Sequence, residues 1–244
     1  SVQRRNQKIV EESPSVFITP ELRRDMGEKA VAAAKAVNYI GAGTIEFLVD
    51  KHRNYYFLEM NTRLQVEHPI TEEVVGVDLV KEQIKVADGQ VLQLRQEDIQ
   101  QRGHAIECRI CAEDTEMNFM PSPGVIKQIT DYDPMIGKLI VWATTREYAI
   151  ERMRRVLHEY KLTGVKNNIS YLRAIMDTPG FVEGHYDTGF IAKNGEVLQQ
   201  CITRTSERAE NIALIAAYMD YLMNLEENNS GLAADNRPIS KWKE

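Results

Sequence analysis

Polar and apolar side chains alternate along the segment FLEMNTRLQVEHPI, residues 57–70. If this segment is extended, side chains two residues apart share one face. One face would then carry five polar residues, which we call the polar row: Glu59, Asn61, Arg63, Gln65 and Glu67. The opposite face would carry apolar side chains that are expected to meet a core: Leu58, Met60, Leu64 and Val66.

A second strand, TIEFLVD at residues 44–50, precedes the polar row, and the residues KHRN between the two suit a hairpin turn. If Asp50 pairs with Tyr55, Glu46 lies directly opposite Glu59. Like charges in that position destabilise a sheet. A cation between the two carboxylates is therefore expected.

The residue types of the row suit phosphate chemistry. Carboxylate and amide oxygens are hard ligands that Mg²⁺ or Mn²⁺ accepts beside nucleotide phosphates. Arg63 can fork onto a phosphate or onto a similar anion such as bicarbonate. Glu67 can act as a general base if burial raises its pKa. The competing interpretation is the solvated face of an amphipathic hairpin, which for any single charged residue is the commoner outcome.

Composition narrows the class of protein. The 244 residues are 43% hydrophobic and 27% charged, as in an ordinary soluble globular chain with a substantial core. A net charge of −6 argues against a broad nucleic-acid surface. We expect no membrane contact, because no apolar run approaches a membrane span and the first residues lack a signal peptide. Three cysteines favour a reducing compartment, so the cytoplasm is the expected location.

The rest of the chain mixes helices and strands, with hairpins among them, which predicts an α+β fold. A helix should begin after Thr19, with Pro20 at its first position, and should end before Gly41. Further helices are predicted at 78–89, 145–162 and 167–178, and further strands at 103–114 and 135–144. A turn is predicted at PSPG, residues 121–124. One long helix should start at Ser206, with an apolar stripe that suits a core or an interface, and a mobile polar tail should follow from 226.

The segment EMNTRLQVEHP resembles the signature of biotin carboxylases, the ATP-grasp component of biotin-dependent carboxylases. The likeness continues, in family order, through QRRNQKIVEE, GAGTIEF, GVDLVKEQI, RGHAIECRICAED, PSPG and YDPMIGKLI. The resemblance implies the C-terminal half of an ATP-grasp domain at 1–102, mainly antiparallel sheet with helices. It further implies a biotin carboxylase C-terminal α/β domain at 103–193 and a helical extension with a polar tail at 194–244.

Roles for individual residues follow from the same resemblance. The catalytic residues would be Arg63 and Glu67. The metal ligands would be Glu46, Glu59 and Asn61. Bicarbonate would be bound by Lys8, Arg63, Gln65 and the backbone of Val66. ATP would be contacted by Gln3, Leu48 and Val165.

The family uses ATP, Mg²⁺ or Mn²⁺ and bicarbonate to carboxylate biotin on a carrier protein, by way of carboxyphosphate. The resemblance therefore implies a carrier protein or domain, a carboxyltransferase subunit and a homodimer as partners. The family's N-terminal domain and glycine-rich lid have no counterpart in these residues, so the chain alone is expected not to turn over. Two other interpretations stay open: another ATP-grasp ligase that joins a carboxylate to an amine, and a non-catalytic assembly module.

Overall fold

The computed structural model describes residues 1–5, 7–123 and 134–233, with side chains omitted at 204–210 and 223–233. The chain divides into two compact units, Ser1–Leu198 and Gln199–Glu244. No helix in the described ranges is both long enough and apolar enough to cross a membrane.

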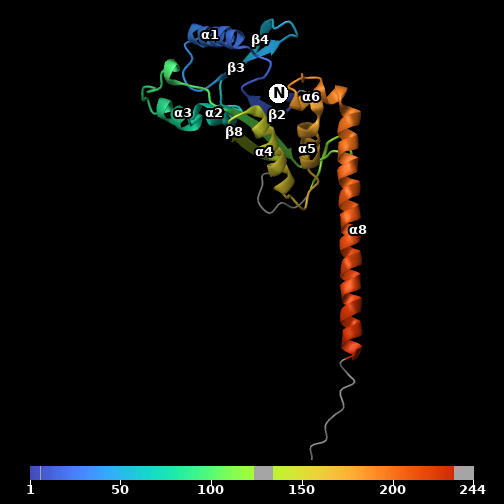
Figure 1. Ribbon diagram of the computed structural model, residues 1–244. Helices are drawn as coiled ribbons and strands as arrows, with labels where there is room; N and C mark the ends of the chain where they lie inside the picture. Colours follow the sequence, from blue (N-terminus) through green and yellow to red (C-terminus); the bar gives the residue numbers. More distant parts are fainter. Residues whose placement is uncertain (6, 124–133, 234–244) are drawn as a thin grey trace, which may run out of the picture. The chain divides into compact units, whose positions relative to one another are not determined.

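A four-stranded antiparallel sheet forms the centre of the first unit (Figure 1). Its strands lie in the order β1 (Val2–Arg4), β2 (Gln7–Ser13), β5 (His104–Cys111) and β8 (Met135–Ala143). The sheet thus joins strands from both sides of residue 102, where the sequence predicts a domain boundary, and that boundary stays a prediction.

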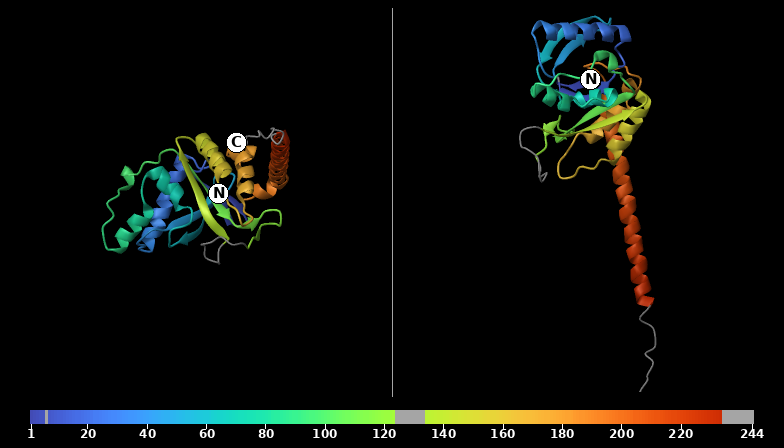
Figure 2. Two further views of the ribbon diagram at one scale, coloured as in Figure 1. Left: turned by 90° about the horizontal axis from the view of Figure 1, so that it is seen from below. Right: turned by 90° about the vertical axis from the view of Figure 1, so that its left-hand side faces the viewer.

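The two faces of β5 pack against different helices. Ala105 contacts Ile70 and Val74 of α2 (His68–Val75). The side chains of Ile106 and Ile110 point to the opposite face, because neighbouring residues of a strand alternate, and both are fully buried. Helices α4 (Arg146–Glu159) and α5 (Ile169–Asp177) lie side by side and contact β5 (Figures 1 and 2).

The predicted hairpin forms from β3 (Thr44–Val49) and β4 (Tyr55–Asn61), and it follows helix α1 (Pro20–Ala36). The predicted start of α1 is confirmed: Thr19 caps the helix by accepting a hydrogen bond from the Leu22 amide at 3.3 Å. No residue of α1 is fully buried.

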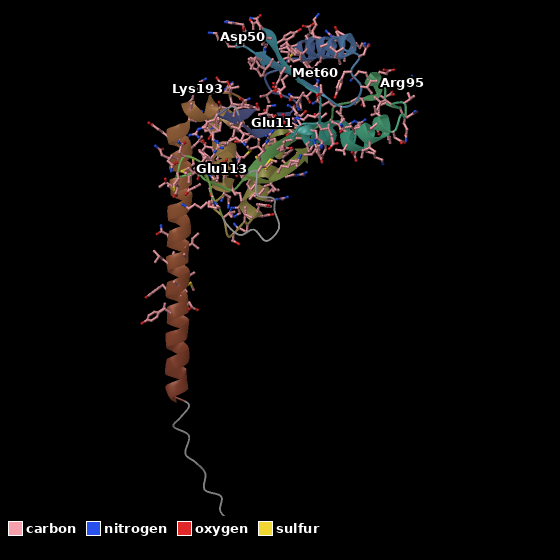
Figure 3. The ribbon with its side chains drawn as sticks, turned by 180° about the vertical axis from the view of Figure 1, so that it is seen from behind. Glu11, Asp50, Met60, Arg95, Glu113 and Lys193 are labelled. Carbon is pink, nitrogen blue, oxygen red and sulfur yellow. The ribbon has the colours of Figure 1, made fainter. Side chains whose placement is uncertain are left out.

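The register of this hairpin places Glu46 directly opposite Glu59, as predicted. The predicted pairing of Asp50 with Tyr55 is wrong, because Tyr55 pairs with Val49. Asp50 instead lies in the turn (Figure 3), where its carboxylate accepts hydrogen bonds from the amides of residues 52 and 54 at 2.8 and 2.9 Å. Leu58 forms a β-bulge, which adds one residue to β4 and so brings Glu59 opposite Glu46. The side chain of Leu58 is 50% exposed, so the prediction that it faces a core is wrong.

The polar row is not one strand. Strand β4 ends at Asn61, residues 62–67 form bends and a turn, and α2 begins at His68. The prediction of an extended face through Glu67 is therefore wrong. Pro69 explains the change, because proline in the first turn of a helix fixes a helical φ and needs no amide donor.

The remaining elements agree with an α+β fold, which is confirmed. They are α3 (Leu79–Ala87), the 3-10 turn η1 (Gln96–Asp98), β6 (Glu113–Asp114), β7 (Met120–Pro121), α6 (Pro179–Val182) and α7 (Phe190–Lys193). The predicted PSPG turn ends at Gly124, outside the described residues.

Helix α8 (Gly195–Ala233) supplies the described part of the second unit. It starts earlier than the predicted Ser206, and it continues through the first residues of the predicted polar tail. The rest of that tail, 234–244, lies outside the described residues. Among the described residues, Ile212 and Leu222 at the two ends of the apolar stripe are 60% and 41% exposed.

Candidate functional site

Lys8 of β2 connects the sheet with the hairpin and with the turn before α2. Its Nζ donates to Glu67 Oε1 at 2.6 Å and to Glu46 Oε1 at 3.2 Å. Burial alone would lower the pKa of Lys8, but the hydrogen bond to Glu67 and the surrounding carboxylates raise it above its ordinary value. Lys8 therefore stays charged between two of the predicted site residues.

The two facing carboxylates of the hairpin share one amide. Asn61 Nδ2 donates to Glu46 at 3.2 Å and to Glu59 at 3.0 Å. The amide of Gln65 also donates to Glu46 Oε1. The structure thus brings together the three predicted metal ligands and one predicted bicarbonate contact, and all four lie on or just after the β3–β4 hairpin.

The donor set suits a divalent cation. The amide protons of Asn61 lie between the two facing carboxylates, and Lys8 adds a positive charge beside Glu46. Turning the Asn61 amide over would present its oxygen there instead, which is a free choice of orientation for an asparagine. Within the described ranges no group of three His, Cys, Asp or Glu side chains could hold a metal. Phosphate oxygens and water would have to complete the shell, as they commonly do for Mg²⁺.

Glu67 lies between two cations. Its Oε2 accepts from Arg109 Nη2 at 2.8 Å, while its Oε1 accepts from Lys8. Burial by itself raises the pKa of Glu67, but the Lys8 hydrogen bond and Arg109 outweigh it and lower the pKa. The sequence-based condition for a strong base, a raised pKa, is therefore not met. Glu67 is held ionised and ready to accept a proton, but as a weak base.

Two cations of this site were missed by the sequence reasoning. Arg109 on β5 and Lys138 on β8 are direct cross-strand partners. Lys138 Nζ donates to the carbonyl of Val66 at 2.5 Å, and so fixes the turn that precedes α2. The alternation of Glu107 and Arg109 on a predicted strand indicates a charged face. Only the sheet pairing reveals that this face meets Glu67.

Four further residues are predicted for the site: Gln3, Arg63, Leu48 and Val165. Gln3 pairs with Lys8 across β1 and β2. Arg63 is exposed, and its Nη1 donates to the carbonyl of the next residue at 3.0 Å. Leu48 is 52% exposed on β3. Val165 lies in the loop before α5, where its carbonyl accepts from Asn167 at 3.4 Å. The roles of all four residues stay predictions.

Two family models match the chain. The model for the carbamoyl-phosphate synthase L chain, ATP binding domain, matches residues 1–95. The model for the biotin carboxylase C-terminal domain matches residues 127–193.

Similar proteins come from plants, animals and bacteria. The chain is 50% identical over 230 residues to chloroplastic biotin carboxylase 2 of Populus trichocarpa, covering 84% of this chain and 44% of that protein. It is 46% identical to the mitochondrial methylcrotonoyl-CoA carboxylase subunit alpha of Mus musculus, covering 80% and 30%. Biotin carboxylase 2 of Bacillus subtilis is 47% identical, covering 80% and 48%. The chain thus spans less than half the length of these relatives.

Solved structures agree in fold. One is the biotin carboxylase domain dimer of Hydrogenobacter thermophilus 2-oxoglutarate carboxylase with MgADP, ADP and bicarbonate. It has a TM-score of 0.78 at 45% identity, over 81% of this chain and 48% of that one. Another is the Campylobacter jejuni biotin carboxylase in a β-γ-ATP complex, with a TM-score of 0.74 at 44% identity, over 79% and 48%.

Proposed function

Since the chain belongs to the biotin carboxylase family, we propose that it carries the bicarbonate-facing wall of an ATP-dependent biotin carboxylase. The observation that carries this proposal is the junction at Lys8, which holds Glu46 of the hairpin and Glu67 of the turn together. A solvated hairpin face would not need a half-buried lysine shared by two carboxylates. The reaction would be the carboxylation of carrier-bound biotin, with ATP and bicarbonate as co-substrates.

The hairpin would hold the metal. Glu46, Glu59 and the oxygen of Asn61 would bind Mg²⁺ or Mn²⁺, which would neutralise phosphate oxygens of ATP. The Hydrogenobacter structure, with MgADP and bicarbonate, supports Mg²⁺ as the first choice. ATP would also contact Gln3, Leu48 and Val165.

Bicarbonate would lie beside Glu67. Lys8, Arg63, Gln65 and the amide of Val66 would hold the anion, and Glu67 would take its proton. The deprotonated oxygen would then attack the γ-phosphorus of ATP, ADP would leave, and carboxyphosphate would form. Arg63 would have to turn from its present contact with the neighbouring carbonyl to reach this anion.

The partners would be a biotin carrier protein or domain, a carboxyltransferase subunit and a second copy of the chain. The cytoplasm is the proposed location, because a chain with only three cysteines suits a reducing compartment. The boundaries at 102 and 193 are proposed as the domain limits. The comparisons do not favour either alternative, another ATP-grasp ligase or an assembly module.

The test is bicarbonate-dependent ATP hydrolysis with and without free biotin. The chain would be assayed alone, and also after mixing with a polypeptide that supplies the region of the relatives outside the match. We expect turnover only in the mixture, with stimulation by biotin. Glu67→Gln and Arg63→Ala should each lower the rate by about 10²-fold or more, the usual scale for a general base or an anion-binding group.

A matched control is Glu82→Gln. Glu82 is part-buried like Glu67 and is also paired with a lysine, Lys85 at 2.7 Å, but it lies on α3 away from the junction. This variant should keep the wild-type rate. A confirmed complex without any turnover would support the assembly module, and turnover that does not depend on biotin would support another ATP-grasp ligase.

A further inference from the structure

Two buried glutamates face each other in the central sheet. Glu11 of β2 and Glu107 of β5 are direct antiparallel partners. Their exposed fractions are 9% and 0%. Directly opposite residues have Cβ atoms about 5 Å apart. At that separation in a buried setting, two carboxyl groups ionise one after the other, because the charge of the first opposes the ionisation of the second.

Neither glutamate is satisfied as an anion. Both oxygens of Glu107, and Oε1 of Glu11, are inaccessible to solvent and have no hydrogen-bond partner among the described residues. A buried carboxylate without donors carries a high desolvation cost, which protonation removes. Burial raises the pKa of Glu11, and of Glu107, to about 7.

The cations around the pair are already engaged. Lys8 of β2 binds Glu67, Lys138 of β8 binds the Val66 carbonyl, and Arg109 of β5 binds Glu67. The carboxylate of Glu67 also acts on the pair and raises the pKa of both residues. The pair therefore has positive charge nearby but no dedicated ion-pair partner.

Arg109 connects this pair with the site. Its Nη2 lies 2.8 Å from Glu67 Oε2 and 3.9 Å from Glu11 Oε1, while its Nε has no hydrogen-bond partner. Glu11 lies in the interior of the first unit (Figure 3). One guanidinium nitrogen thus faces two carboxyl groups, and it binds more strongly to whichever of them is ionised.

We propose that Glu11 and Glu107 hold one proton between them, and that this proton determines how firmly Arg109 binds Glu67. This inference rests on the proposed role of Glu67 as the base. While the proton is on Glu11, this carboxyl group does not compete, and Arg109 keeps Glu67 a weak base. Loss of the proton draws Arg109 toward Glu11, and Glu67 becomes the stronger base. Glu11 and Glu107 are thus positioning residues.

The first test is a titration of the glutamate carboxyl carbons by ¹³C NMR on the chain itself, from about pH 4 to 9. In the wild type at least one carboxyl should titrate near neutral pH. Glu11→Gln and Glu107→Gln assign it, and in each variant the remaining partner should titrate lower by about one unit or more, because the opposing charge is gone. If all wild-type carboxyls titrate close to 4.5, the inference is wrong, and that result needs no variant to fold.

The control for this titration is Glu113→Gln. Glu113 is also buried, but Arg4 binds both of its oxygens at 2.8 Å. Its replacement should leave the neutral-pH titration unchanged. A shift as large as that of the Glu107 variant would overturn the assignment to the pair.

The second test is the pH dependence of turnover in the mixture described above. The rate should rise with pH as the pair loses its proton. Glu107→Gln should move that rise to lower pH by about one unit, since Glu11 then ionises more easily. Glu11→Gln should abolish the rise, since nothing competes for Arg109. Unchanged midpoints in both variants would overturn the inference.

The two tests separate the two claims. Absence of turnover would count against the proposed function and would leave the NMR result standing. Turnover with ordinary carboxyl titrations would refute the shared proton alone.

Discussion

Glu11 and Glu12 are neighbours on β2, yet they are opposites as acids. Both side chains are largely buried, and they point to opposite faces of the sheet. Glu12 Oε2 accepts from Arg146 Nε at 2.8 Å and lies 2.7 Å from His104 Nε2, and its Oε1 accepts from the Tyr186 hydroxyl. Glu11 has one oxygen without any hydrogen-bond partner among the described residues.

The difference shows what determines the charge of a buried carboxyl group. Burial raises the pKa of each residue. For Glu12 the hydrogen bonds from His104 and Arg146 outweigh burial and lower the pKa, whereas for Glu11 burial and the charge of Glu67 raise it to about 7. The Glu12 face ties β2 and β5 to α4, so it is structural. The Glu11 face is left unsatisfied beside the proposed site.

The largest expected effect on stability is from Glu12→Gln, which removes the carboxylate that His104, Arg146 and Tyr186 contact. Arg146 would lose its buried counter-charge, so the free energy of unfolding at pH 7 should fall by about 3–5 kcal/mol. Urea unfolding followed by circular dichroism measures this. A loss below about 1 kcal/mol would mean that the network contributes no more than ordinary hydrogen bonds.

The pH dependence of this loss has a definite sign. The pKa of Glu12 is lowered, so its contribution is present above 4.5, its ordinary value, and is lost as the pH falls through the lower folded value. The wild type and Glu12→Gln should therefore converge in stability in acid. A constant gap down to low pH would contradict the role of the charge.

Glu11→Gln should change the free energy of unfolding in the opposite direction, by raising it. The pKa of Glu11 is raised, so its contribution is present below 4.5 and is lost as the pH rises through about 7. Glutamine does not ionise, so the variant does not lose stability as the pH rises. At pH 8 the variant should be more stable than the wild type by roughly 1–3 kcal/mol, and the two should agree near pH 4. Urea unfolding at both pH values tests this, and a variant that is less stable at pH 8 would break the comparison.

Tyr186→Phe should have a smaller effect on the satisfied face. It removes one donor to Glu12 and keeps the ring stacked on Phe181, whose centroid is 5.3 Å away. The free energy of unfolding should fall by about 1 kcal/mol, the usual scale for one hydrogen bond. A loss equal to that of Glu12→Gln would show that the hydroxyl, and not Arg146, dominates the network.

The smallest effect is expected at an ion pair outside both faces. Arg155 and Glu159 lie 4.0 Å apart on α4, and both side chains are about 70% exposed. Arg155→Ala should change stability by less than about 0.5 kcal/mol. A larger change would mean that surface charges obscure the contrast between Glu11 and Glu12.

The parts of the site that local pattern determines could be predicted from the sequence. Alternation predicts the two strands and their carboxylates, but the turn pairs Val49 with Tyr55, and Glu46 lies opposite Glu59 only because of the bulge at Leu58, which the sequence analysis did not predict. Pro69 is a local signal for a helix start, and it is incompatible with an extended row that continues through Glu67.

The contribution of the central sheet could not be predicted in this way. Arg109 reaches Glu67 only because β5 lies between β2 and β8, and that order depends on pairing between strands that are far apart in the chain. Glu11 and Glu107 lie opposite each other for the same reason. No local periodicity encodes such partners, since each strand alone is compatible with several neighbours.

The bulge at Leu58 has a consequence for engineering. It adds one residue between the turn and the paired carboxylates. The turn determines that Val49 pairs with Tyr55, and the bulge then shifts the pairing by one residue, so that Glu46 pairs with Glu59. Turn length and carboxylate alignment are therefore separate variables in this hairpin. Replacing the tip at residues 51–54 with a tag or a longer loop should leave Glu46 and Glu59 face to face, which makes this turn a suitable place to attach a probe.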